Sequence, residues 1–318
     1  MPLLIHDSLT YRKAGITQMT AKAIWMDGEL VDWDEANVHV TSFGLHYGIG
    51  FFEGIRCHST PAGPAIFRLT DHLQRLRRSA AVYGFELPYP VEEMAHACKL
   101  VVSANGLTDC YLRPIVFLGE GASVIEARFR TAVIATADGP LAGPAKEAGV
   151  RACISSFRRI SPNSIPPAAK ATGQYLNSFL AEAEAITSGY EEAIMLNDSG
   201  QVSDGWAHNV FAVTDGVLVT PPVSAGALPG ITRETVMTLA AEDGIEVRQH
   251  GLVRSDLYLA DECFLTGTAA GVVPVISVDG RGVGTGKPGP LTTSLRDRLT
   301  QITHGAVDAH PQWREYLG

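Results

Sequence analysis

The sequence is poor in charged residues, cysteine and long apolar runs, and each shortage excludes a class of protein. Charged residues make up 19% of the chain and the net charge is −9, so no basic surplus exists to neutralise nucleic-acid phosphates. The five cysteines are odd in number, scattered and never in a CxxC pair, which argues against a zinc ribbon or a disulfide framework. No apolar stretch approaches the ~18 residues of a membrane span, and the N-terminal residues lack the apolar region of a signal peptide. We therefore expect a cytoplasmic protein with reduced thiols that binds neither nucleic acid nor a membrane.

Common catalytic motifs are missing as well. The ten histidines include no HxxxH pair and no cluster with carboxylates at metal-ligand spacing, so we predict no catalytic metal. No GxSxG is present, and no GxGxxG follows a predicted strand. Any catalytic residues of this chain are therefore expected in segments of another kind.

Strand and helix signals alternate along both halves of the 318 residues, a length that suits one large or two ordinary domains. Two short strands flank Asp27-Gly28 and predict a hairpin over 23–32. Between 138 and 144 the chain is rich in glycine, proline and alanine and loses hydrophobic periodicity, which marks the best domain boundary. We predict an α+β fold with a small N-terminal domain over 1–137, a linker over 138–146 and a large C-terminal domain over 147–318. Ligands of such proteins commonly bind between the domains.

Hydrophobic periodicity predicts the individual elements. An amphipathic helix after Thr70 carries Arg75 between two apolar positions. Further helices are predicted over 92–105, 175–188, 231–243 and 254–260, and strands over 38–40, 66–69, 111–118, 131–136, 149–157, 192–197, 209–213, 217–220, 245–249 and 262–266.

Lys170 has an unusual context, because two prolines and several small residues precede it in the segment 164–175. Such a chain packs closely around an inserted group and leaves a lysine little room to reach water. Burial disfavours the charged ammonium form, and a neutral amine is the nucleophile that condenses with an aldehyde. The residues alone leave a solvated surface lysine as the alternative.

Two segments could hold an anion. Leu228-Pro-Gly-Ile-Thr-Arg233 precedes a predicted helix and would place backbone N–H groups and a hydroxyl at its N-terminus. A plain helix start with Thr232 as the cap is equally consistent with this segment. The turn 265–271 is rich in small residues and would let a ligand approach its backbone amides. Arg75 is either a phosphate ligand or a solvated arginine.

Together these segments resemble one enzyme family. The resemblance rests on their order and spacing: 38–48, Phe52-Glu-Gly-Ile-Arg56, 72–76, Tyr111-Leu-Arg-Pro114, the Lys170 segment, 228–233 and Thr266-Gly-Thr-Ala-Ala270. In this order the chain is similar to the class IV (fold type IV) aminotransferases that use pyridoxal 5′-phosphate (PLP), most closely to branched-chain amino acid aminotransferases. The resemblance implies the two-domain fold type IV architecture and transfer of an amino group between a branched-chain or related amino acid and a 2-oxo acid such as 2-oxoglutarate.

The resemblance also implies the cofactor contacts. Lys170 would form a Schiff base with PLP and shuttle a proton. Tyr175 would hydrogen-bond the phenolic oxygen of the cofactor, and Leu228 would pack against its ring. Asp204 aligns with the carboxylate that contacts the pyridine nitrogen. The phosphate would be bound by four residues: Arg75, Ile231, Thr232 and Thr268.

Substrate contacts follow from the same resemblance. Tyr111 and the amides of Thr268 and Ala269 would receive the α-carboxylate, and Arg113 would bind the distal carboxylate of glutamate or 2-oxoglutarate. Phe52 would line the side-chain pocket. Two more residues of the family-like segments complete the predicted substrate contacts: Arg56, and Tyr47 supplied by the partner subunit of a homodimer.

Four positions depart from the family pattern. Asp204 is one methylene shorter than the usual glutamate, and His208 replaces a second glutamate. Trp206 is bulky where a small residue is common, and Gly271 stands where an acidic residue is usual. These changes leave three alternatives: a PLP-dependent lyase, a transaminase for an atypical biosynthetic substrate, and a PLP-binding protein with weakened catalysis.

Overall fold

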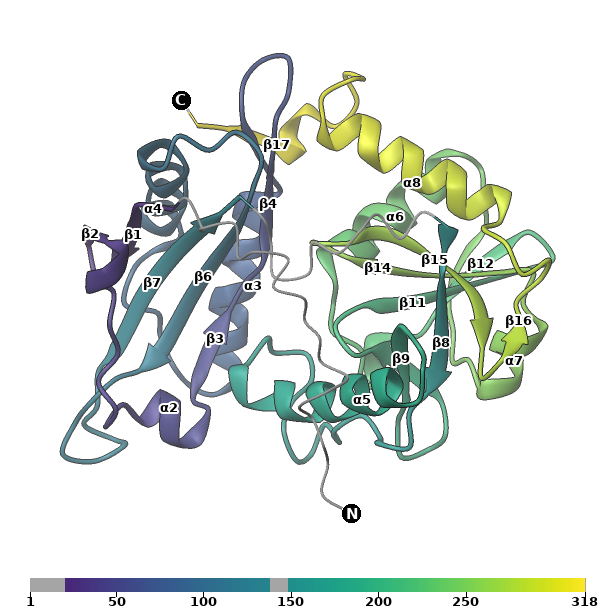
Figure 1. The fold of residues 1–318 in the computed structure, drawn as a ribbon, viewed down its shortest axis with the longest axis horizontal. Coiled ribbons are helices and arrows are strands. Elements are labelled where there is room, and N and C mark those ends of the chain that lie inside the picture. Colours follow the sequence, from purple (N-terminus) through teal and green to yellow (C-terminus); the bar gives the residue numbers. More distant parts are fainter. Residues whose placement is uncertain (1–20, 138–147, 318) are drawn as a thin grey trace.

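The computed structural model of the chain describes residues 21–137 and 148–317. Two sheets lie side by side, the first on the left of Figure 1 and the second on the right. The first sheet has the order β17-β5-β4-β6-β7-β1-β2, with β3 paired to β6. Its strands are β1 (Ala23–Met26), β2 (Glu29–Asp32), β3 (Gly50–Phe52), β4 (Ile55–His58), β5 (Ala65–Phe67), β6 (Cys110–Leu118), β7 (Phe129–Thr136) and β17 (Arg314–Tyr316).

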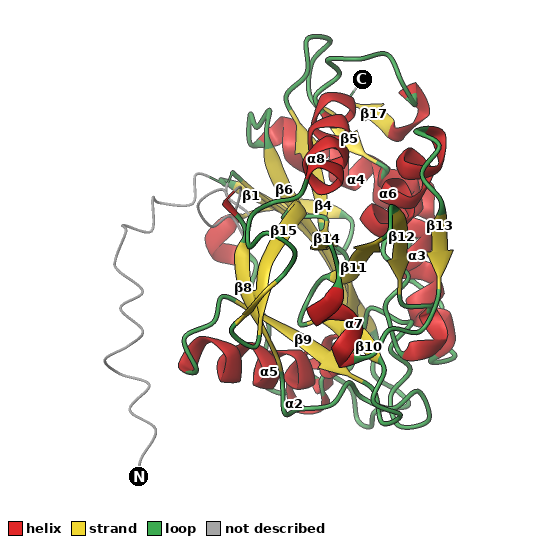
Figure 2. Ribbon diagram, turned by 90° about the vertical axis from the view of Figure 1, so that its right-hand side faces the viewer, coloured by secondary structure: helices red, strands yellow, loops and turns green. Residues whose placement is uncertain are grey.

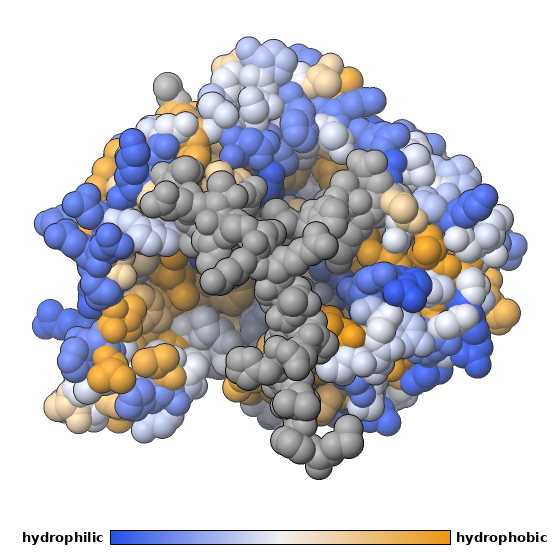
Figure 3. Space-filling view, viewed as in Figure 1, coloured by the Kyte–Doolittle hydropathy of each residue, from blue (hydrophilic) through white to orange (hydrophobic). Residues whose placement is uncertain are grey.

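Helices cover one face of the first sheet and leave part of the other face open. The helices of this half are η1 (Trp33–Glu35), α2 (Phe43–Tyr47), α3 (Leu69–Val82) and α4 (Val91–Ala104). Leu73 and Leu76 of α3 and Val101 of α4 are buried against the sheet in one apolar core. The other face of β1, β6 and β7 carries Ile115, Phe117 and Ile134 and borders an apolar groove of about 840 Å³. Figure 3 shows apolar side chains around a hollow in this half of the molecule.

The second sheet has the order β10-β9-β8-β15-β14-β11-β12-β13, with β16 paired to β15. Its strands are β8 (Val150–Ile154), β9 (Glu192–Leu196), β10 (Val202–Gly205), β11 (Asn209–Thr214), β12 (Val217–Thr220), β13 (Val247–Gln249), β14 (Glu262–Gly267), β15 (Gly271–Val278) and β16 (Arg281–Gly282). Its helices are η3 (Thr172–Gln174), α5 (Tyr175–Thr187), η4 (Val223–Ala225), α6 (Ile231–Glu242), α7 (Arg254–Leu259), α8 (Pro290–Thr303) and η5 (Pro311–Trp313).

Strand periodicity divides the core of this half. Along β11, Val210 and Ala212 join one buried cluster, whereas Phe211 and Val213 join another with residues of α6 and α8. Figure 2 shows α6 and α8 on the same side of the sheet. In the part of the chain that the structure describes, no helix is both long and apolar enough to cross a membrane.

The last strand, β17, belongs to the first sheet although it follows the whole second sheet in sequence. Arg314 pairs with Phe67 of β5, and its buried guanidinium donates hydrogen bonds to the carbonyls of Ile302 and Val307. The predicted linker over 138–146 lies outside the described residues.

Most predicted elements are confirmed. The hairpin pairs Ala23 with Asp32 and Met26 with Glu29, and the helices over 175–188 and 231–243 correspond to α5 and α6. The strand over 38–40 was predicted wrongly. These residues pair with no strand in the part of the chain that the structure describes, and Val38 and Val40 are exposed. A β-rich sequence forms a strand only where a neighbour can accept its backbone hydrogen bonds.

Candidate functional site

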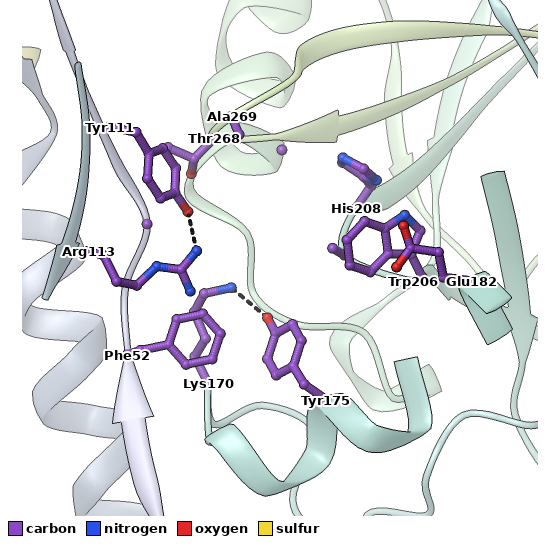
Figure 4. A pocket seen from close by; sticks show the side chains of 13 residues that line it. Phe52, Tyr111, Arg113, Lys170, Tyr175, Glu182, Trp206, His208, Thr268 and Ala269 are labelled. Atoms are coloured by element: carbon purple, nitrogen blue, oxygen red, sulfur yellow. Dashed lines mark hydrogen bonds between the residues drawn. The ribbon is translucent and has the colours of Figure 1, made fainter. Parts of the chain in front are cut away.

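A central cavity of about 360 Å³ lies between the two sheets, and Figure 4 shows its side chains. Loops and strands of both halves contribute to it: Phe52, Gly54, Tyr111, Arg113, Lys170, Tyr175, Glu182, Trp206, Ala207, His208, Gly267, Thr268 and Ala269. Seven predicted site residues are thus brought together here, from segments more than 200 residues apart.

Lys170 is the nucleophile candidate of this cavity. Its Nζ lies 2.7 Å from the hydroxyl of Tyr175 and 5.0 Å from the centroid of the Phe52 ring. The backbone around it is held in place, because its N–H donates to Ser79 Oγ and its carbonyl accepts from Phe52 N–H. Lys170 is half-buried and points into the cavity, so it is not a solvated surface lysine.

Arg75 is buried and bound to an acidic partner that the sequence pattern did not indicate. Its Nε and Nη2 each lie 2.7 Å from an oxygen of Glu53, which is fully buried, and its Nη1 lies 3.0 Å from the carbonyl of Pro229. Burial alone raises the pKa of Glu53, but Arg75 and His72 hold it well below its usual range. Two of the five guanidinium donors remain for an anion. Glu53 belongs to the family-like segment Phe52–Arg56, but nothing in the sequence indicated that it pairs with Arg75.

Helix α6 begins beside Arg75 and offers an anion site. Its N-cap is Gly230, and no side chain caps the first turn. Thr232 lies inside the helix, so the alternative in which it is the cap is wrong. The uncapped amides of Ile231 and Thr232, the helix dipole and the spare donors of Arg75 together suit a doubly charged phosphate. A Cβ at Gly230 would meet Asn209 Oδ1 at 1.9 Å, so only glycine allows this close approach.

Asp204 lies in a small cavity that adjoins Tyr175, Leu228 and His208. Its Oδ2 accepts from Leu228 N–H at 2.7 Å and its Oδ1 accepts from Asn209 Nδ2 at 2.8 Å. Burial raises the pKa of Asp204 to about 6, against the opposing effect of Arg159. Asn209 orients this carboxylate, a role that the sequence did not indicate.

The wall formed by the first sheet presents cationic and aromatic groups. Arg113 Nη2 donates to the Tyr111 hydroxyl at 3.0 Å, and its guanidinium carbon lies 4.6 Å from the centroid of Phe52. A Cβ at Gly54 would meet that hydroxyl at 1.9 Å, which explains why a glycine stands in the segment. Burial raises the pKa of Tyr111. This wall can receive a carboxylate from two directions.

The wall formed by the second sheet contains two of the four departures from the family pattern, Trp206 and His208. His208 Nδ1 lies 3.1 Å from Oε2 of buried Glu192, and the rings of Trp206 and His208 meet edge to face at 6.0 Å. Figure 4 shows Trp206, His208 and Glu182 grouped opposite Arg113.

Two predicted substrate residues lie elsewhere. Tyr47 on α2 is 63% exposed and borders the apolar groove rather than the central cavity of its own chain. Arg56 Nη2 lies 2.5 Å from Asp109 Oδ1 and borders a second cavity of about 160 Å³.

Comparisons with known proteins agree with this geometry. The family model described as "Amino-transferase class IV" matches residues 50–278. The chain is 45% identical to the branched-chain-amino-acid aminotransferase of Escherichia coli (strain K12), over 95% of this chain and 99% of that protein. It is 43% identical to the Pseudomonas aeruginosa enzyme of the same name, over 92% of this chain and 96% of that protein.

Solved structures give the same result. The crystal structure of the Escherichia coli branched-chain amino acid aminotransferase has a TM-score of 0.91 and 44% identity, covering 94% of this chain and all of that one. The enzyme of the same name from Thermobaculum terrenum, solved in its PLP-form, has a TM-score of 0.87 and 33% identity, covering 95% of this chain and all of that one. The chain therefore belongs to the class IV aminotransferases and has their two-domain α+β fold, and its reaction is the PLP-dependent transfer of an amino group from an amino acid to a 2-oxo acid.

Proposed function

We propose that the protein transfers the amino group of a branched-chain amino acid to a 2-oxo acid such as 2-oxoglutarate. The observation that carries this proposal is the position of Lys170, which points into a cavity where Tyr111 and Arg113 can receive a carboxylate. The relatives named above, which bear the name branched-chain-amino-acid aminotransferase, support the substrate class.

The residues present suit PLP. This cofactor supplies an aldehyde that condenses with amines and a ring that withdraws electrons from the substrate α-carbon. Tyr175 would orient the reactive end, Asp204 would contact the pyridine nitrogen, and Leu228 would pack against the ring. The phosphate would be held by Arg75, Ile231, Thr232 and Thr268. In this arrangement Glu53 is a positioning residue, since it fixes the guanidinium of Arg75 through two hydrogen bonds.

The substrate would be oriented by its carboxylates. Tyr111 and the amides of Thr268 and Ala269 would bind the α-carboxylate, and Arg113 would bind the distal carboxylate of the 2-oxo acid. Phe52 would contact the apolar side chain of the amino donor. Because Arg113 stacks on Phe52, one wall serves both a charged and an apolar substrate.

Lys170 would then move the proton at the substrate α-carbon. Its Nζ is close to the hydroxyl of Tyr175 and to the rings of Phe52 and Tyr175. Because the backbone of Lys170 is fixed, its half-buried amine can reach the same substrate atom in each turnover.

We also propose that the protein is a cytoplasmic homodimer whose domains divide at 138–146. All five cysteines are free and buried, which fits a reducing compartment. Each sheet has an apolar core of its own. The apolar groove, with exposed Leu45, Tyr47 and Leu176 at its edge, is an apolar surface of the kind that marks a protein interaction site. A second copy seated there would bury these residues and bring Tyr47 toward the neighbouring site.

A half-reaction tests the proposed function. The PLP-loaded protein should change its absorption spectrum on addition of L-leucine, L-isoleucine or L-valine, and 2-oxoglutarate should restore the first spectrum. Lys170→Ala should abolish the change, whereas Lys99→Ala, on a distant helix, should leave it intact. Absence of any change with all three amino acids would refute the proposed substrate class.

A further inference from the structure

Three potential metal ligands meet outside the central cavity. His58 ends β4, Asp109 directly precedes β6, and His304 directly follows α8. One possible ligand atom of each residue lies within 4.8 Å of those of the other two. Because these residues are 51 and 195 positions apart, no sequence spacing could have indicated the cluster.

The two imidazoles are arranged to offer lone pairs. His304 Nδ1 lies 3.0 Å from the carbonyl of Thr300, which can only accept, so the proton sits on Nδ1 and Nε2 keeps its lone pair. A metal-binding histidine is commonly fixed in this way by a backbone carbonyl. His58 Nδ1 is buried and has no hydrogen-bond partner among the described residues. The two ring centroids are 4.7 Å apart at an interplanar angle of 58°, a separation that suits two ligands of one ion.

Asp109 supplies the negative charge. Its Oδ1 accepts from Arg56 at 2.5 Å, and a carboxylate has further lone pairs for a second partner. Its side chain is 39% exposed, so an ion can enter from solvent. The nearby charge of Arg56 repels a cation and therefore limits the affinity of the site.

We propose that His58, Asp109 and His304 bind one divalent transition-metal ion, such as Zn²⁺, with water as the fourth ligand. Two imidazoles and one carboxylate form a donor set that Zn²⁺ and Co²⁺ accept in tetrahedral geometry. Bond lengths of about 2.0–2.2 Å require ligand atoms roughly 3.5 Å apart, so the side chains must close by about 1 Å. Rotation of the partly exposed Asp109 side chain can supply this movement.

The ion would tie the end of a helix to two strands that already pair with each other. It would join the end of α8 to β4 and to the start of β6. The second cavity, which His58 and His304 border, is also lined by Thr232 and Thr268, two of the proposed phosphate ligands. None of the three metal ligands lines the central cavity, so the role of the ion is to stabilise this side of the protein rather than to act on the substrate.

Metal binding by tag-free, chelator-treated holoenzyme tests the proposal. Titration with Co²⁺ should give the visible absorption of a tetrahedral site at one ion per chain, and Zn²⁺ should displace it. His58→Gln and His304→Gln should each weaken Co²⁺ binding by at least about tenfold. His250→Gln, which changes an exposed histidine of another segment, should have no effect.

A second measurement guards against misfolded variants. Melting curves of the two variants without metal should match that of the wild type, and only the wild type should gain stability when Zn²⁺ is added. Failure of the wild type to bind Co²⁺ at millimolar concentration would overturn the proposal. Equal binding by the wild type and both variants would also overturn it.

Discussion

Replacing Asp204 with asparagine should change how the stability of the apoprotein depends on pH. Burial raises the pKa of this carboxyl from 3.8 to about 6 in the folded protein. At a pH between these two pKa values, Asp204 keeps its proton in the folded chain but has released it in the unfolded chain. The free energy of unfolding therefore falls as the pH rises. The shift corresponds to about 3 kcal/mol, which is lost as the pH rises through 6. Roughly half of this loss develops between about pH 5 and pH 8.

Urea denaturation of the apoprotein across this pH range measures the effect. Asp204→Asn also disturbs the hydrogen bond from Asn209, which adds an offset that does not vary with pH. The informative quantity is therefore the difference between wild type and variant, which should move in favour of the variant by about 1.5 kcal/mol from pH 5 to pH 8. Asp198→Asn, in an exposed turn, is the control and should run parallel to the wild type. If the Asp204 variant also runs parallel, the reasoning about this buried carboxylate is refuted.

Three further changes follow from the site and its surroundings. Glu53→Gln leaves Arg75 buried without its acidic partner and should lower the free energy of unfolding by about 3–5 kcal/mol. Bound PLP should recover part of this loss, which urea denaturation can measure. A loss below about 1 kcal/mol would contradict the proposed role of Glu53. Trp206→Ala widens the cavity and should raise kcat/KM for phenylalanine relative to leucine by roughly tenfold. An unchanged ratio would place the pocket for the substrate side chain elsewhere. Leu45→Glu puts a charge in the apolar groove and should yield monomers in sedimentation velocity, whereas Leu259→Glu, at an exposed position elsewhere, should leave the dimer intact. A dimer in both variants would exclude the groove as the interface.

The local elements were predictable because their signals lie in neighbouring residues. Helices α5 and α6 show apolar periodicity between clear start and stop signals, and the hairpin around Asp27-Gly28 has its turn residues in place. Residues 38–40 mimic a strand, but a strand depends on a partner that their own sequence cannot specify.

The partners of the predicted site residues were not predictable. The bond between Glu53 and Arg75 joins a loop to a helix, and the contact between Glu192 and His208 joins a strand to the residue just before another strand. Neither pair has a fixed spacing that the chemistry demands. The resemblance to a family predicted which residues carry the reaction, and the structure shows the residues that hold those side chains in position.

The return of β17 to the first sheet has a consequence for synthesis on the ribosome. The ribosome delivers Arg314–Tyr316 only after every strand of the second sheet has been made. Until then β5, which pairs with β17 on one side and β4 on the other, has an open edge with unpaired backbone groups. The nascent first half therefore has an unpaired strand edge through most of the synthesis of both sheets, and this edge closes only when Arg314–Tyr316 emerge.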